Sequence, residues 1–188
     1  MELTPATVAA KADEYRDEEP LYPVEQERIE GLPDAFERGE FGWRDAEWVV
    51  RWYYRRHLGG ISHEERRAAE KRFGRNDFET VERVIDDVTA LSDTAEQVSR
   101  LTTLEGVDVP LASAYLLFVD PTSYIVVGER EVAVLDAAGR LPDTFSDFSS
   151  IEGYETYLES CHSVATDAEC DMWTLYRALW RLSTELDE

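Results

Sequence analysis

The chain has few lysines and few cysteines. Its only lysines are Lys11 and Lys71, so arginine supplies almost all of the positive charge. The two cysteines, Cys161 and Cys170, cannot build a zinc site by themselves, and His162 adds a third ligand at an unsuitable spacing. We therefore predict buried free thiols and no metal site.

Long apolar runs are also missing. No stretch approaches the roughly 20 apolar residues of a membrane-spanning helix, and the first residues, MELTPATVAAKADE, lack the basic and apolar regions of a signal peptide. From this we expect a soluble, cytoplasmic protein with no membrane partner.

Positive charge is scarce overall. Forty-one acidic residues face nineteen basic ones, which gives a net charge of −22 at pH 7. Such self-repulsion is tolerable where salt screens it, since the Debye length is only about 3 Å at 1 M salt. The acidic, lysine-poor composition therefore indicates a halophile, with an acidic mesophilic protein as the alternative. In a halophile, bulk acidity does not argue against binding nucleic acid.

Helix signals recur along the chain, and strand signals do not. Thr4 before Pro5 is typical of a helix start, and residues 43–57 and 78–91 carry apolar residues at helical spacing. Four pairs match the capping-box spacing: Ser62 with Glu65, Asn76 with Glu79, Ser149 with Glu152, and Thr166 with Glu169. Only residues 124–127 resemble a strand, too short to build a sheet. We predict an all-α protein of about eight to ten helices.

Prolines and glycines divide the predicted helices into two parts. Residues 17–42 are acidic and contain three prolines and three glycines, so we expect short helices and turns there. The predicted organisation is an acidic N-terminal arm with short helices, residues 1–42, packed on a main domain at residues 43–188.

Residues 101–119, LTTLEGVDVPLASAYLLFV, predict a helix, a tight hairpin and a buried helix. Gly106 suits a turn that needs positive φ or a close approach of backbone. Residues 111–119 are apolar almost all round, so their helix belongs in the interior. The N–H groups at such a hairpin can hold an anion, as helix N-termini hold phosphate.

The hairpin and the segment after it share a wider pattern of leucine, glycine, alanine and valine positions. These are Leu101, Leu104, Gly106, Val107, Ala112 and Ala114 in the hairpin part, then the apolar pair Val126 and Val127 before the next helix. The segment Leu101–Leu135 resembles the helix–hairpin–helix (HhH-GPD) superfamily of base-excision DNA glycosylases, of which the chain looks like a divergent, halophile-like member. The resemblance implies a DNA-glycosylase-like multi-helix fold that binds double-stranded DNA.

The same resemblance shows where the family's chemistry is missing. The position of the catalytic aspartate falls on Gly128, which has no side chain to support an oxocarbenium ion. The lysine nucleophile of the bifunctional members falls on Pro110, so any activity would lack the lyase step. Two cysteines cannot hold the four-cysteine iron–sulfur cluster of some members. No cofactor is expected.

Acidic residues near the vacant position are candidates to replace the aspartate. Glu129 and Glu131 flank Gly128, although the simpler interpretation places both in solvent in the first turn of a helix. In the hairpin, Asp108 stands where the family has a second glycine, and aspartate tolerates left-handed backbone well enough to keep the turn. Its carboxylate would face DNA phosphate, and a monovalent cation is a candidate to bridge the two.

Residues 44–75 form a basic island, with nine Lys/Arg against five Asp/Glu. Within it, WVVRWYYRRH at residues 48–57 interleaves arginine with aromatic rings, as suits phosphate contact and base stacking. The alternative is that Trp48, Trp52 and Tyr53 are core residues while the arginines pair with nearby glutamates. His57 and His63 are expected at the surface.

The sequence therefore predicts a DNA-glycosylase-like protein that binds DNA in connection with base-excision repair. The predicted DNA contacts are Gly106, Val107, Asp108, Val109, Arg130, Arg51, Arg55 and Arg56. Two alternatives stay open: a monofunctional N-glycosylase using Glu129 or Glu131, and a helical protein-interaction module that does not bind DNA. The oligomeric state does not follow from the sequence.

Overall fold

The computed structural model describes residues 1–57 and 60–186, and these contain ten helices and no strand. The helices are α1 (Pro5–Glu18), α2 (Tyr22–Glu37), α3 (Trp43–Arg55), α4 (His63–Phe73), α5 (Phe78–Ala90), α6 (Thr94–Leu101), α7 (Val109–Val119), α8 (Glu129–Ala137), α9 (Ile151–Asp167) and α10 (Met172–Leu186). The predicted all-α class is confirmed. None of these helices is long and apolar enough to cross a membrane.

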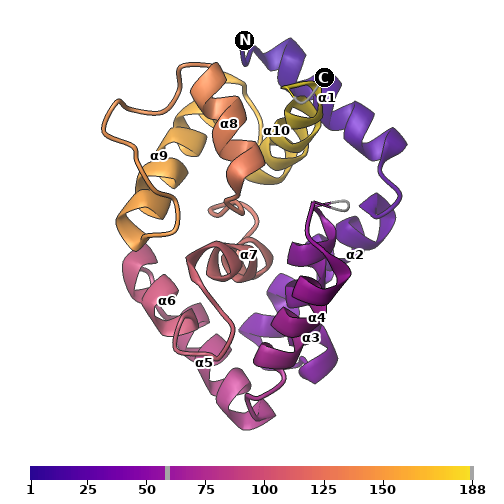
Figure 1. The fold of residues 1–188 in the computed structure, drawn as a ribbon, viewed down its shortest axis with the longest axis vertical. Coiled ribbons are helices and arrows are strands. Elements are labelled where there is room, and N and C mark those ends of the chain that lie inside the picture. Colours follow the sequence, from indigo (N-terminus) through magenta and orange to yellow (C-terminus); the bar gives the residue numbers. More distant parts are fainter. Residues whose placement is uncertain (58–59, 187–188) are drawn as a thin grey trace.

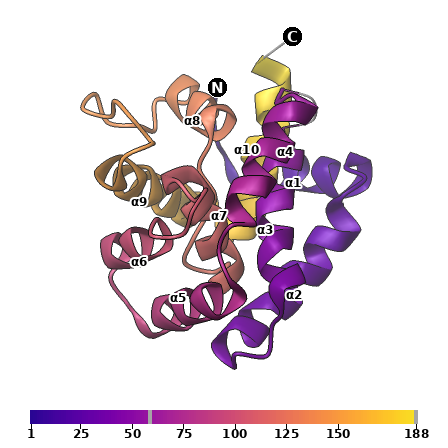
Figure 2. The same cartoon turned by 60° about the horizontal axis from the view of Figure 1, so that its bottom comes forward.

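Helix α7 lies at the centre of the molecule. Figures 1 and 2 show α7 surrounded by other helices, and in Figure 1 α1, α8, α9 and α10 lie towards one end and α3 to α6 towards the other. Residues 110–118 are all buried, as the nearly continuous apolar sequence predicts. Helix α7 packs on α2, α3, α6 and α9, so it links the two groups of helices.

The N-terminal helices are part of the core. Helix α1 packs along α10, and the side chains of Val8, Ala12 and Tyr15 are buried. The expectation of short helices in residues 17–42 is wrong for α2, which runs for 16 residues. Pro33 lies inside α2, where burial of Ile29, Leu32 and Phe36 offsets the hydrogen bond that proline cannot make.

The sequence predicted the presence of the helices better than the residues that cap their N-terminal ends. The Ser62 capping box is present, with Ser62 Oγ accepting from the Glu65 amide and the Glu65 carboxylate accepting from the Ser62 amide. At the next helix the cap is Asp77, not Asn76. Similarly, Ser150 rather than Ser149 caps α9, and α9 continues through Thr166. Adjacent polar residues offer alternative caps, and packing selects between them.

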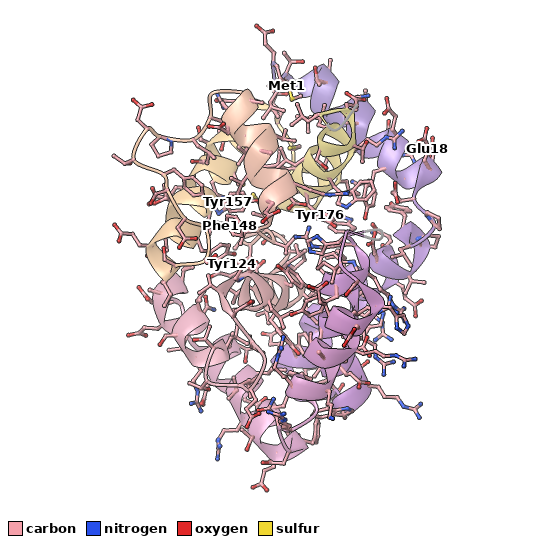
Figure 3. The ribbon with its side chains drawn as sticks, viewed as in Figure 1. Met1, Glu18, Tyr124, Phe148, Tyr157 and Tyr176 are labelled. Carbon is pink, nitrogen blue, oxygen red and sulfur yellow. The ribbon has the colours of Figure 1, made fainter. Side chains whose placement is uncertain are left out.

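The segment between α7 and α8, residues 120–128, is non-helical, and residues 124–128 are buried. Buried backbone needs hydrogen-bond partners, which side chains supply here. Tyr154 Oη donates to the Ile125 carbonyl (3.1 Å), and Tyr157 Oη donates to the Val126 carbonyl (3.0 Å; Figure 3 labels Tyr157). Ser113 Oγ accepts from the Val127 amide at 3.0 Å. These bonds fix the path of the chain into α8.

Helices α1, α2 and α3 meet at the buried carboxylate of Glu25. Tyr15 Oη and Trp52 Nε1 each donate to it at 2.7 Å. Burial raises the pKa of Glu25, and the two donors oppose that shift only in part. A raised folded-state pKa gives stability that is present below the unfolded-state pKa and is lost as pH rises through the folded-state value.

We therefore predict that Glu25→Gln increases the free energy of unfolding more at pH 7 than at pH 4. Glutamine keeps both contacts, because its oxygen accepts from Trp52 and its amide donates to the Tyr15 oxygen. Urea denaturation at both pH values and one KCl concentration measures the difference. Glu27→Gln, on the exposed side of α2, is the control and should show no such pH dependence. A larger cost for Glu25→Gln at pH 7 than at pH 4 would contradict the prediction.

Candidate functional site

The hairpin between α6 and α7 is built on Gly106. Its backbone has φ +82°, and a Cβ at this position would lie 2.9 Å from the Phe73 amide nitrogen and 3.0 Å from Arg72 Cβ. Glycine is therefore required both by the backbone conformation and by the close approach of the end of α4. The predicted order of helix, hairpin and buried helix is confirmed.

Asp108 has a different backbone from the one expected. Its φ of −97° and ψ of 178° are extended, not left-handed, because Asp108 is the N-cap of α7. Its Oδ1 accepts from the Leu111 amide at 2.9 Å. Val107 is buried and its amide donates to the Leu104 carbonyl. The amides of Gly106, Asp108 and Val109 have no hydrogen-bond partner within the described residues.

Gly128, at the position where the resemblance would place a catalytic aspartate, is the N-cap of α8 and is buried. Its backbone is extended, so any residue has a suitable conformation there. Space excludes a side chain instead: a Cβ would lie 2.5 Å from Arg56 Nη2 and 2.9 Å from Glu131 Oε2. The position is vacant because a buried ion pair fills the adjoining space.

That ion pair joins α3 to α8. Arg56 and Glu131 are 3% and 0% exposed, with Nη1 and Oε1 2.7 Å apart. Arg56 Nη2 also approaches Glu131 Oε2 and the Val127 carbonyl, each at 3.4 Å. Burial opposes the charged guanidinium, but the Glu131 carboxylate together with Tyr176 and Tyr53 outweighs burial and raises the pKa of Arg56. Rings of Tyr53, Trp52 and Tyr176 surround the guanidinium.

The buried pair corrects two sequence predictions. Arg56 is not a surface arginine available to DNA phosphate, because its guanidinium is enclosed in the core. Glu131 is not a solvent-facing charge, and Arg56 occupies its carboxylate, so it is unsuited to act as a catalytic base. Glu129 alone, of the two acidic candidates, is exposed.

A pocket of about 350 Å³ opens between the N-terminal ends of α7 and α8. It brings together four predicted site residues, Asp108, Gly128, Glu129 and Arg130. Its remaining walls come from Tyr53, Tyr54, His57, Gly60, Ile61 and Phe148. The volume is within the range of small-molecule sites. Phe148 was not predicted, since it comes from the loop before α9, which stands out from the helices in Figure 2.

His57 is more enclosed than its expected surface position. It is half-buried, and its Nε2 is buried without a hydrogen-bond partner among the described residues. Burial, together with the nearby positive charges of Arg56 and Arg130, lowers the pKa of His57 to about 3. The imidazole is therefore neutral at physiological pH and brings no charge to the pocket.

The basic island is divided between two places. Arg51 pairs with Glu47 at 3.0 Å, and Arg55 is exposed but lines a small separate pocket with Trp48 and Trp52. In contrast, the end of α4 lies against the hairpin, where the guanidinium of Arg75 is 3.4 Å from the Glu105 carboxylate. The structure therefore places α4, rather than Arg51 and Arg55, beside the hairpin.

Metal-binding groups do not gather anywhere in residues 1–57 or 60–186: no three His, Cys, Asp or Glu side chains are arranged to hold an ion. Both cysteines are free thiols. Cys161 is buried, and Cys170 is only half-buried. Burial, together with the nearby charge of Asp171, raises the pKa of the Cys170 thiol to about 11. Neither cysteine is a reactive thiolate at neutral pH.

Comparisons of the chain with protein-family models, curated proteins and solved structures find no match. The resemblance to DNA glycosylases therefore rests on the residues of Leu101–Leu135, and the assignment to that fold family stays a prediction.

We predict that Gly128→Ala destabilises the protein by about 3 to 5 kcal/mol, because the new methyl group displaces Arg56 from Glu131 and separating a buried pair costs this much. Chemical denaturation measures the change. Gly31→Ala is the matched control, since Gly31 lies in α2 with open space around it. Alanine there should increase the free energy of unfolding by at most about 1 kcal/mol. Equal stability of Gly128→Ala and the unaltered protein would show that the pair is not a constraint on position 128.

Proposed function

We propose that this protein is a DNA-glycosylase-like DNA-binding protein, related to base-excision repair, that accepts one unpaired base in the pocket between α7 and α8. The observation that carries the proposal is the pocket itself, which adjoins the hairpin at Asp108 and the vacant position at Gly128. A protein that acts on a base in a duplex must take that base out of the stack and hold it in such a pocket.

The walls of the pocket suit a nucleobase. Tyr53, Tyr54 and Phe148 contribute aromatic rings, and stacking of a base on such rings is worth about 1 to 3 kcal/mol. Glu129 and Arg130 add polar groups that orient a bound ring. Aromatic walls with a few polar groups are typical of pockets that bind flat heterocycles.

The hairpin supports the proposal because its amides are suited to binding a phosphate of the DNA backbone. The amides of Gly106, Asp108 and Val109 have no partner within the described residues, and they lie at the N-terminal end of the 11-residue helix α7. Such amides and the positive end of the helix dipole favour phosphate. The exposed carboxylate of Asp108 opposes that attraction, so binding is expected to need the screening of high salt.

The absence of a carboxylate at position 128 argues for binding without aspartate-assisted catalysis. A glycosylase stabilises positive charge on the sugar as the base leaves. Here the nearest side chains to position 128 are Arg56 and Glu131, whose charges compensate each other. The pair leaves no free negative charge at the place where the family's mechanism needs it.

We predict that Tyr54→Ala weakens binding to a duplex with one extrahelical base about tenfold, because it removes a stacking surface. Fluorescence anisotropy in multimolar KCl measures the dissociation constant. Tyr22→Ala, a half-buried tyrosine on α2 away from the pocket, is the matched control and should bind as the unaltered protein does. Absence of binding to any duplex would overturn the proposal and favour a helical protein-interaction module.

A working N-glycosylase is a second candidate, because Glu129 lines the pocket and is not held by an ion pair within the described residues. If Glu129 activates water, the protein should form abasic sites in damaged-base duplexes, and Glu129→Gln should abolish their formation. Gel analysis after alkaline cleavage detects the product. Asp136→Asn, at the exposed end of α8, is the control. Duplex binding without abasic product would rule out this candidate.

A further inference from the structure

The first turn of α8 presents two oppositely charged side chains to the pocket. Glu129 and Arg130 both line it, and within the described residues neither makes a hydrogen bond or an ion pair. The Arg130 guanidinium instead lies over the ring of Trp180, 5.8 Å from its centroid. One carboxylate and one guanidinium, each without a partner in the described residues, thus line the same pocket.

Other charged groups at the site are already engaged. Asp108 accepts from the Leu111 amide, and Arg56 and Glu131 bind each other. His57 is neutral and adds a buried ring nitrogen without a partner in the described part of the chain. The charged groups of the pocket that have no partner in the described residues are therefore the Glu129 carboxylate and the Arg130 guanidinium.

We infer that the pocket is selective for guanine, and this inference rests on the proposed function. Guanine carries two donors side by side, N1–H and N2–H, which match the two oxygens of a carboxylate such as Glu129. It also carries two adjacent acceptors, O6 and N7, which a guanidinium such as Arg130 binds through two parallel hydrogen bonds. The aromatic walls from Tyr54 and Phe148 stack on either purine, so the selectivity comes from α8.

The other bases match Glu129 and Arg130 less well than guanine does. Adenine presents its N1 acceptor to the carboxylate, which repels it, and offers the guanidinium N7 beside a donor. Cytosine and thymine each place an acceptor next to a donor, so neither satisfies both oxygens of Glu129. A phosphate alone is also disfavoured, because Asp108 and Glu129 outnumber Arg130 among the charged residues that line the pocket.

Binding to one duplex with a single extrahelical position tests the inference, with guanine, adenine, cytosine, thymine, inosine, 7-deazaguanine or an abasic residue at that position. We expect guanine to bind about tenfold or more tightly than each other natural base, as one bidentate contact discriminates in DNA recognition. Inosine lacks the 2-amino group and 7-deazaguanine lacks N7, so each should lose most of that advantage. Anisotropy in multimolar KCl measures all seven duplexes.

Two variants test whether the preference for guanine comes from Glu129 and Arg130 on α8. Glu129→Gln should remove the preference for guanine over inosine, and Arg130→Gln should remove the preference for guanine over 7-deazaguanine. Asp136→Asn and Arg140→Gln, at and beyond the far end of α8 and outside the pocket lining, are the matched controls and should keep both preferences. Circular dichroism and a thermal melt establish that each variant is folded.

The outcomes separate this inference from the proposed function. Equal binding of all extrahelical bases, each tighter than the abasic duplex, would overturn guanine selectivity and keep the base-binding pocket. Equal binding of abasic and base-containing duplexes would overturn the pocket itself. Guanosine monophosphate is a further ligand. Tight binding of the free nucleotide with no duplex binding would support guanine recognition and overturn the DNA proposal.

Discussion

The buried ion pair between Arg56 and Glu131 is the interaction on which the rest of the structure depends. It links the end of α3 to the first turn of α8 across 75 residues of sequence. Because two opposite charges are buried together, removing either partner would leave an uncompensated charge in the core. The pair also occupies the space beside Gly128, so it sets both the stability of this junction and the absence of a side chain at the candidate site.

The non-helical segment before α8 connects the buried ion pair to the pocket. Its carbonyls accept hydrogen bonds from Tyr154, Tyr157 and Arg56, so a buried stretch without helix or strand still has partners for its backbone. That fixed path directs the N-terminal end of α8 towards the N-terminal end of α7. The N-terminal ends of both helices therefore line the pocket, and buried polar contacts position the start of α8.

The proposed DNA binding requires favourable contacts that act over a short range. The net charge of −22 repels a duplex at long range, and salt shortens that repulsion more than it weakens stacking or partly buried hydrogen bonds. The pocket offers contacts of the short-range kind: aromatic rings, a neutral imidazole, and one carboxylate beside one guanidinium. Backbone amides at the hairpin add to them without adding charge.

The sequence by itself determined the helical class, the hairpin at Gly106 and the buried character of α7, because helical periodicity, a glycine turn and an all-apolar run act over a few neighbouring residues. It did not determine which charges are buried. Arg55 and Arg56 are adjacent in an arginine-rich run, yet one is exposed and the other enclosed, and Glu129 and Glu131 differ in the same way. Only the tertiary structure decided these cases, since burying a charge depends on a partner that the fold brings from a distant part of the chain.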